Sequence, residues 1–144
     1  MSNREFFTRI SEWGDRVDGD LEKLAQRSIQ RLAKQVVIDT PFDLGILRGN
    51  WQPSIGQPNL EGGSPDAGGR AIADIALKVL DLKPGETFYM VNNTAYARRL
   101  EHGFVGEDSL GRKYNQTGRH YVGNNVKRWA LIVEQEAARL KEGK

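Results

Sequence analysis

The chain has 144 residues, a formal net charge of +2 and no cysteine. This length predicts a single domain, residues 1–144, with room for a hydrophobic core. The missing cysteine excludes disulfides, thiolate metal ligands and a cysteine nucleophile. The nearly balanced charge lacks the concentrated basic face of a dedicated nucleic-acid-binding protein. Since no apolar run reaches the ~20 residues of a membrane span and no signal-peptide pattern is visible, we expect a protein of the cytoplasm or of something assembled there.

A long amphipathic helix is predicted over residues 4–38. Its apolar positions recur at spacings of three and four, which is typical of a one-faced helix; they are Phe6, Ile10, Trp13, Val17, Leu21, Leu24, Leu32 and Val36. Gly14 and Gly19 each weaken the helix by about 1 kcal/mol relative to Ala, which leaves room for a break within 14–20. An unbroken helix would be about 50 Å long, whereas a compact domain of this size is roughly 30–35 Å across. The excess must overhang, bend or pack on a neighbouring molecule.

The next segment contains short elements and a loop. Thr40 precedes a proline, which disfavours the helical conformation and ends the first helix. A short helix is expected over 44–48. Residues 50–55 alternate as a strand, and Pro53 within it indicates a sheet edge. Residues 56–69 are rich in Gly, Pro, Ser and Asp and predict a flexible loop.

The second half of the chain completes an α+β pattern. A middle helix over 69–82 is followed by a turn, a strand over 87–92 that pairs in a small antiparallel sheet, and a helix over 93–101 capped by Asn93 or Thr94.

A long polar insert, residues 104–121, is predicted as a loop or hairpin, and a final helix is predicted over 123–140.

No catalytic, metal-binding or cofactor-binding residues are expected. Gly106 and Gly111 have the spacing of part of a phosphate-binding loop, but the Lys-Ser or Lys-Thr pair that must follow is missing, which favours a hairpin turn. His102 and His120 have no standard ligand spacing. No serine lies in a nucleophile-elbow pattern, and no two carboxylates form an obvious acid–base couple.

Protein contact is the better interpretation of the remaining features. Trp51 and Trp129 are expected to pack in the core or on a helix face, whereas Trp13, on the overhanging helix, is the best candidate for an intersubunit anchor. A long loop that mixes aromatic and charged residues suits partner binding. The candidate interface residues are Trp13, Arg98, Arg99, Phe104, Asp108, Arg112, Lys113 and Tyr114.

Two stretches carry a resemblance to a known family. These are residues 40–51, Thr-Pro-Phe-Asp-Leu-Gly-Ile-Leu-Arg-Gly-Asn-Trp, and residues 89–103, Tyr-Met-Val-Asn-Asn-Thr-Ala-Tyr-Ala-Arg-Arg-Leu-Glu-His-Gly. With the closing helix over 126–138, they make the chain similar to the HK97-gp10-like neck and tail-completion proteins of tailed bacteriophages. The Asp-Leu-Gly of the first stretch stands where the family more often has Asp-Thr-Gly, and the 104–121 insert is longer than in its shortest members.

The resemblance implies a structural protein of the virion, assembled in the host cytoplasm. Such proteins form homo-oligomeric rings, with six or twelve copies expected, at the junction of head and tail. Their neighbours are head–tail connector or adaptor proteins and the tail terminator or tail tube. Phage DNA passes through the central channel without sequence readout, and no enzyme activity, cofactor or membrane contact is implied.

Two alternatives stay open. Within the same class, the chain is a tail terminator or a head–tail adaptor of a neighbouring ring. In another class, it is a small nucleic-acid-binding protein that uses its basic pairs, among them Arg98-Arg99 and Arg112-Lys113, and would bind DNA with a steep dependence on salt.

Overall fold

The first helix is one unbroken rod. The structure, a computed structural model, describes residues 3–42, 45–107 and 109–143, without the side chains of residues 6, 7, 10, 13, 15 and 18. Helix α1 spans Asn3–Asp39, 37 residues, or about 55 Å at the rise of an α-helix. The predicted helix over 4–38 is confirmed, but the break allowed for within 14–20 is absent. The cost of two glycines is small beside the helical bonds on either side.

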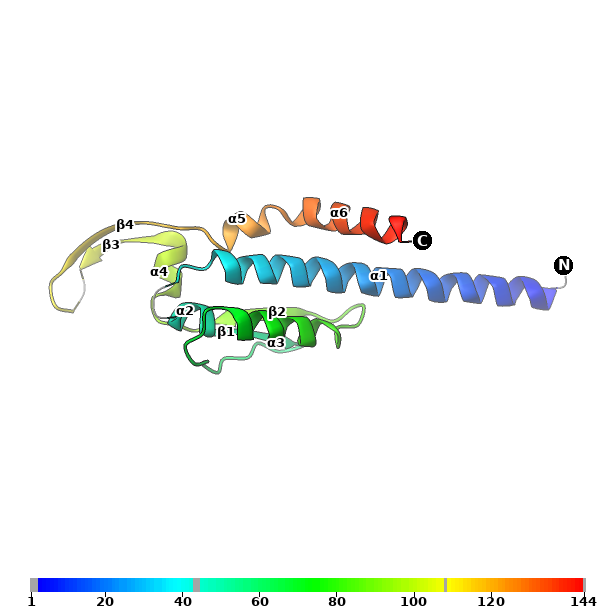
Figure 1. Cartoon of the computed structure of the whole chain (residues 1–144), viewed down its shortest axis with the longest axis horizontal. Coiled ribbons are helices and arrows are strands. Elements are labelled where there is room, and N and C mark those ends of the chain that lie inside the picture. The colour runs from blue at the N-terminus through cyan, green and yellow to red at the C-terminus, as the bar shows by residue number, and fades with distance from the viewer. Residues whose placement is uncertain (1–2, 43–44, 108, 144) are drawn as a thin grey trace.

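The C-terminal half of α1 is the spine of the body (Figure 1). Helix α3 (Gly69–Val79) packs on one side of it and helix α6 (Trp129–Glu142) on another. The core joins α1, α3 and the first sheet, and its completely buried members include Val37 and Ile75. Burial of these apolar side chains is the main force that holds the elements together.

The first sheet pairs β1 (Trp51–Ile55) with β2 (Phe88–Asn92) in antiparallel register, Trp51 opposite Asn92 and Ile55 opposite Phe88. Both strands were expected, as was the position of Pro53 on an edge, since a two-stranded sheet has only edge strands.

Thr40 and Trp51 fix the junction between α1 and this sheet. The Thr40 hydroxyl donates to the carbonyl of Val36 (2.6 Å) and accepts from Nε1 of the buried Trp51 (2.9 Å). Between them lies helix α2 (Ile46–Gly49), close to the expected 44–48. Arg48 donates to the carbonyls of Ile38 (3.0 Å) and Thr40 (2.7 Å), so it satisfies the end of α1.

Loop 56–69 contains no helix or strand before α3 begins at Gly69, but it is tied to the body. Asn50 Oδ1 accepts from Gly63 N–H (2.8 Å), and Arg70 donates to the Ser64 carbonyl (2.6 Å). A Cβ on Gly49 would lie 2.0 Å from the Ser64 carbonyl oxygen, so the loop approaches α2 more closely than any side chain allows.

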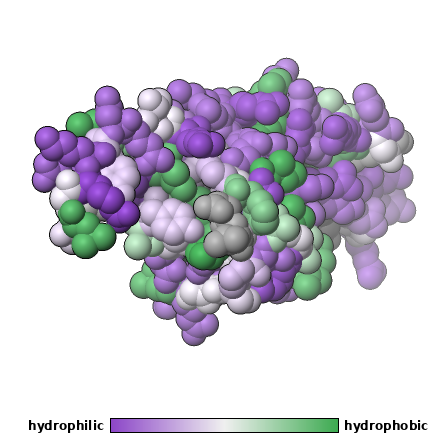
Figure 2. Space-filling view, turned by 60° about the vertical axis from the view of Figure 1, so that its left-hand side comes forward, coloured by the Kyte–Doolittle hydropathy of each residue, from purple (hydrophilic) through white to green (hydrophobic). Residues whose placement is uncertain are grey.

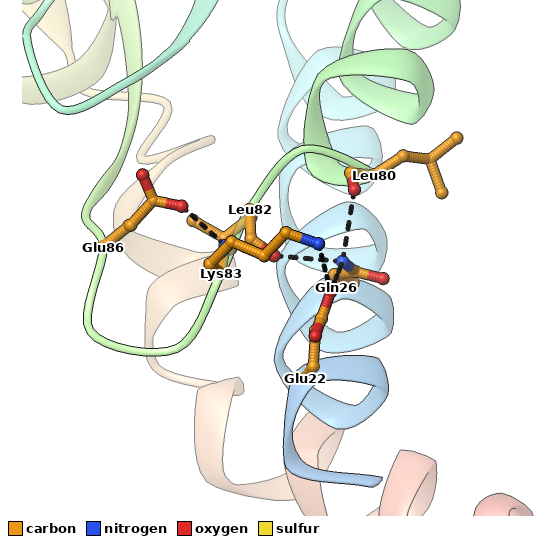
Figure 3. Close-up of polar contacts among 6 residues, drawn as sticks. All are labelled: Glu22, Gln26, Leu80, Leu82, Lys83 and Glu86. Atoms are coloured by element: carbon orange, nitrogen blue, oxygen red, sulfur yellow. Dashed lines mark hydrogen bonds and ion pairs between the residues drawn. The ribbon is translucent and has the colours of Figure 1, made fainter. Parts of the chain in front are cut away.

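The turn after α3 is bound to α1 where that helix leaves the body (Figure 3). Gln26 Nε2 donates to the Leu82 carbonyl (3.0 Å), and Lys83 Nζ donates to Glu22 Oε1 (3.0 Å). The Lys83 N–H donates to Glu86 Oε1 (2.7 Å). Helix α3 therefore ends at Val79, three residues before the expected Leu82, and residues 80–86 form a turn that fixes α1 to the start of β2.

The insert over 104–121 forms a hairpin. Helix α4 (Ala97–His102) precedes it and begins after Tyr96, so the expected caps Asn93 and Thr94 were wrong. Strand β3 (Gly103–Glu107) pairs antiparallel with β4 (Lys113–Thr117). Gly103, at φ +86°, makes the sharp exit from α4 that a glycine allows. We call residues 103–117 the arm.

The closing helix is divided, contrary to the single helix expected over 123–140. Helix α5 (Gly123–Val126) is separated from α6 by residues 127 and 128. The buried Glu101 carboxylate accepts from the N–H groups of Val122 (2.8 Å) and Gly123 (3.0 Å) and so caps α5. Asn125 is held by Asp39 and by the Tyr121 carbonyl. These hydrogen bonds fix the direction of α5. The chain changes direction after α5, at residues 127 and 128, so that α6 can lie along α1.

Candidate assembly interfaces

The molecule has two projections at opposite ends (Figure 1). At one end, α1 runs past the end of α6, and we call its residues 3–21 the helix extension. At the other end, the arm leaves the body. The helix extension continues α1, whereas the arm is a hairpin inserted between α4 and α5, and the two projections account for the elongated shape of the protein.

The helix extension carries the first half of the apolar stripe. A helical backbone places Phe6, Ile10, Trp13, Val17 and Leu21 along one face, because their spacings of three and four follow the helical period. Leu21 is 55% exposed, although it lies at the edge of the body. The backbone of Trp13, the candidate anchor, lies in this segment, and its side chain is outside the described part of the structure.

The arm brings several of the other candidates together at its base. The guanidinium carbon of Arg99 lies 3.9 Å from the centroid of the Phe104 ring, which is a close cation–π contact. The Phe104 and Tyr114 rings lie 6.1 Å apart at 49°, within the range of favourable aromatic pairs. This stack fixes the direction in which the arm leaves α4.

The distal part of the arm is exposed. Val105 and Leu110 are 77% and 76% exposed, and Lys113 lies opposite Glu107 in the strand pairing. Figure 2, which turns the arm toward the viewer, shows separate apolar spots within a mainly hydrophilic surface. Arg112 is exposed beside the turn, and Asp108 lies outside the described residues.

Arg98 is also exposed and lines a shallow hollow with Arg99 and His102 at the base of the arm. The site candidates thus fall into two groups. Arg98, Arg99, Phe104 and the residues of the hairpin form one surface, while Trp13 belongs to the opposite end of the molecule.

Sequence reasoning missed a third surface, an open apolar groove of about 630 Å³. Its floor is α1, with Leu32 and Val36, one wall is the first sheet, with Met90, and the other wall is α5 and the start of α6, with Val126 and Trp129. Trp51 is buried in the core, whereas Trp129 is 38% exposed and lines the groove, so of the two expected positions, core or helix face, it takes the helix face. The only buried residues of α6 are Ile132 and Glu136, and the periodicity of the last helix gave no sign that Val126 and Trp129 border an open groove.

Two buried polar side chains near the arm, those of Glu101 and Tyr121, have structural partners. Glu101 caps α5, and its Oε1 lies 4.0 Å from Nδ1 of His120. The Tyr121 hydroxyl donates to the Ala97 carbonyl (2.9 Å), and burial, together with the nearby Glu101 charge, raises the pKa of Tyr121 to about 12. Within residues 3–42, 45–107 and 109–143, no three His, Asp or Glu side chains are grouped so as to hold a metal ion.

In the same part of the chain, no helix is both long enough and apolar enough to cross a bilayer. The two stretches that carry the family resemblance lie side by side: Trp51 pairs with Asn92 across the sheet, and Asn92 Nδ2 donates to the Leu47 carbonyl (2.7 Å). They build the framework between α1 and the arm.

No protein-family model matches the chain, and neither a curated protein nor a solved structure matches it.

Proposed function

We propose that this chain is a structural protein of the head–tail junction of a tailed bacteriophage. In this role its copies form a ring that joins the capsid connector to the tail and leaves a channel for DNA. The arm would contact the adjacent layer of the neck, and contacts between copies would close the ring. The output of the protein is shape, and the hydrogen bonds of the buried Glu101 and Asn125 side chains hold helix α5 in the fold.

One observation carries the proposal: the chain has two different projections, at opposite ends of the body. A ring is built by a heterologous contact, in which one patch of each copy binds a different patch of the next. The helix extension keeps an apolar stripe beyond the body, and the arm exposes Val105 and Leu110, so both projections offer apolar contacts to a neighbouring molecule. The α+β order of elements is also the one that the family resemblance implies.

Deletion of residues 105–118 tests the role of the arm. Strands β3 and β4 pair only with each other in the described sheets, so the deleted protein should stay folded and soluble. We expect separate heads and tails to accumulate, which electron microscopy of lysates would show. A matched control replaces Val105 and Leu110 with Thr, which keeps the hairpin and removes only its exposed apolar contacts. Normal infectious particles from the deletion would refute this role.

The position of the protein along the virion axis decides between a neck protein and its alternatives, a tail terminator or an adaptor ring. A small nucleic-acid-binding protein is a separate alternative, favoured by the exposed Arg98 and Arg99 at the base of the arm. It requires that the isolated protein bind DNA with an affinity that falls steeply as salt rises. A flat or absent binding curve supports the structural role.

A further inference from the structure

The groove exposes apolar side chains that the fold of a monomeric protein would be expected to bury. Trp129 and Val126, in one wall of the groove, are 38% and 53% exposed, although the buried core residues Ala33, Val36 and Trp51 line the same groove. Ile29, Leu32 and Val36 of α1 form the floor. Large apolar side chains that remain open beside a core indicate a surface that another element covers.

The shape of the groove suits a helix. Its floor is itself a helix, and the ridges of a second helix fit the grooves of the first at close distance. One wall of the groove is β2, and the other is α5 with the start of α6. The space between these walls is open to solvent and has a volume of about 630 Å³. Side chains from one apolar helix face can enter that space from outside.

The same chain contains an apolar helix stripe that runs beyond its own body, and Leu21, the last residue of the helix extension, is 55% exposed. The stripe of the helix extension continues through Val17 and Leu21 toward the floor of the groove, at Ile29 and Leu32. Because α1 is unbroken from Asn3 to Asp39, the extension cannot fold back onto a groove whose floor is the same helix. The extension that fills the groove must therefore come from another copy.

Charge supports this pairing. Residues 3–21 contain Glu5, Glu12, Asp15, Asp18 and Asp20 against Arg4, Arg9 and Arg16, so three positive and five negative charges give −2. Lys127 and Arg128 are both exposed and stand in the chain between Val126 and Trp129, which line the groove, and these two positive charges outnumber the negative charge of the groove-lining Glu86. Opposite charges at the rim of an apolar contact steer association and fix its register.

We propose that the helix extension of one copy docks in the groove of the next, between the first sheet and helices α5 and α6. This deepens the proposed function, on which it rests, by naming the contact that joins copies. Each copy gives an extension and receives one, so the contact is heterologous and propagates until a ring closes.

The absence of cysteine makes the test direct, because each introduced cysteine is unique. Copies that carry only Val17→Cys are mixed with copies that carry only Val126→Cys, and a short bis-maleimide crosslinker is added. The mixture is examined both as purified protein and in assembled particles. We expect the covalent heterodimer to exceed, at least tenfold, that from a control mixture of Val17→Cys with Leu77→Cys, since Leu77 is 68% exposed on α3, away from the groove.

A second measurement removes the apolar contact without changing charge. The double variant Val17→Gln, Leu21→Gln should raise the concentration for half-assembly at least tenfold, by light scattering or native mass. The matched control is Thr8→Gln, Ser11→Gln, which places the same side chains on the opposite face of the helix extension and should leave assembly unchanged.

Three outcomes would overturn the inference. If the protein is oligomeric but Val17→Cys and Val126→Cys do not crosslink above the control, another surface joins the copies, and the proposed function stands. If Val126→Cys crosslinks to Val105→Cys instead, the arm fills the groove. A chain that stays monomeric, alone and in the particle, overturns both this inference and the proposed function.

Discussion

The two halves of α1 have the same sequence pattern and opposite surroundings. Both carry apolar residues at spacings of three and four, and both are helical. From Glu22 onward, the helix bonds to the turn after α3 and packs against α3 and α6, and Val37 is completely buried. Before Glu22, it leaves the body. An apolar stripe therefore predicts that a helix face will be buried. It does not predict whether the residues that bury it belong to the same chain or to another molecule.

A charge placed on each half gives the largest contrast. Val37→Asp buries an unpaired carboxylate in the core and should destabilise the fold by more than about 4 kcal/mol. Leu21→Asp, on the same helix but 55% exposed, should change the free energy of unfolding by less than about 1 kcal/mol. Both are measured by chemical denaturation at concentrations below assembly. Equal losses would mean that the helix extension is part of the monomer's core.

Two threonines, one in the helix extension and one directly after the end of α1, allow the same comparison with a smaller expected change in the free energy of unfolding. Thr8 and Thr40 each donate to the carbonyl four residues earlier, at 2.9 Å and 2.6 Å, but only Thr40 also accepts from the buried Trp51. Thr40→Ala leaves that indole N–H unsatisfied and should cost about 1–3 kcal/mol in thermal or chemical unfolding. Thr8→Ala is the matched control, with an expected change within about 0.5 kcal/mol. A similar cost at both positions would show that the local helical bond, and not the Trp51 contact, matters.

The smallest expected effect concerns the ion pair at the boundary of the two halves. The hydrogen bond from Lys83 to Glu22, and then the Glu22 charge, raise the pKa of Lys83 above 10.5. A raised amine pKa adds stability that is fully present below pH 10.5 and is lost as the pH rises through the folded-state pKa. Glu22→Gln should lower the Lys83 pKa toward 10.5, as followed by NMR titration, while Glu12→Gln in the helix extension should leave it in place. A Lys83 pKa that ignores Glu22→Gln would contradict the contact.

The sequence predicted those elements whose signals are local. Periodicity placed α1 within one residue at each end, and Pro53 correctly marked an edge strand. The division between α5 and α6 was not predictable, because it depends on bonds from Glu101 and Asp39, far away in the chain. Nor was the start of α4, since the Asn92 side chain accepts from the Thr94 N–H (3.1 Å) and directs a turn there instead of a helix cap.

The candidate surfaces, like the elements of the fold, could be predicted only where the signal is local in the sequence. Arg99, Phe104 and Tyr114 were suspected from composition alone, and the structure brings them into one stack because α4 and the arm meet at Gly103. The groove had no signal of its own. Its floor, walls and rim come from segments that are separated by up to a hundred residues, and each segment separately predicts ordinary core packing.

The unbroken length of α1 links the tip of the protein to the Thr40–Trp51 junction as a single lever. A rod of about 55 Å that pivots by about five degrees at one end moves the other by roughly 5 Å. A molecule that binds the N-terminal end of α1 consequently sets the tilt of the whole subunit. In a closed assembly of such subunits, that tilt determines the diameter of the central opening.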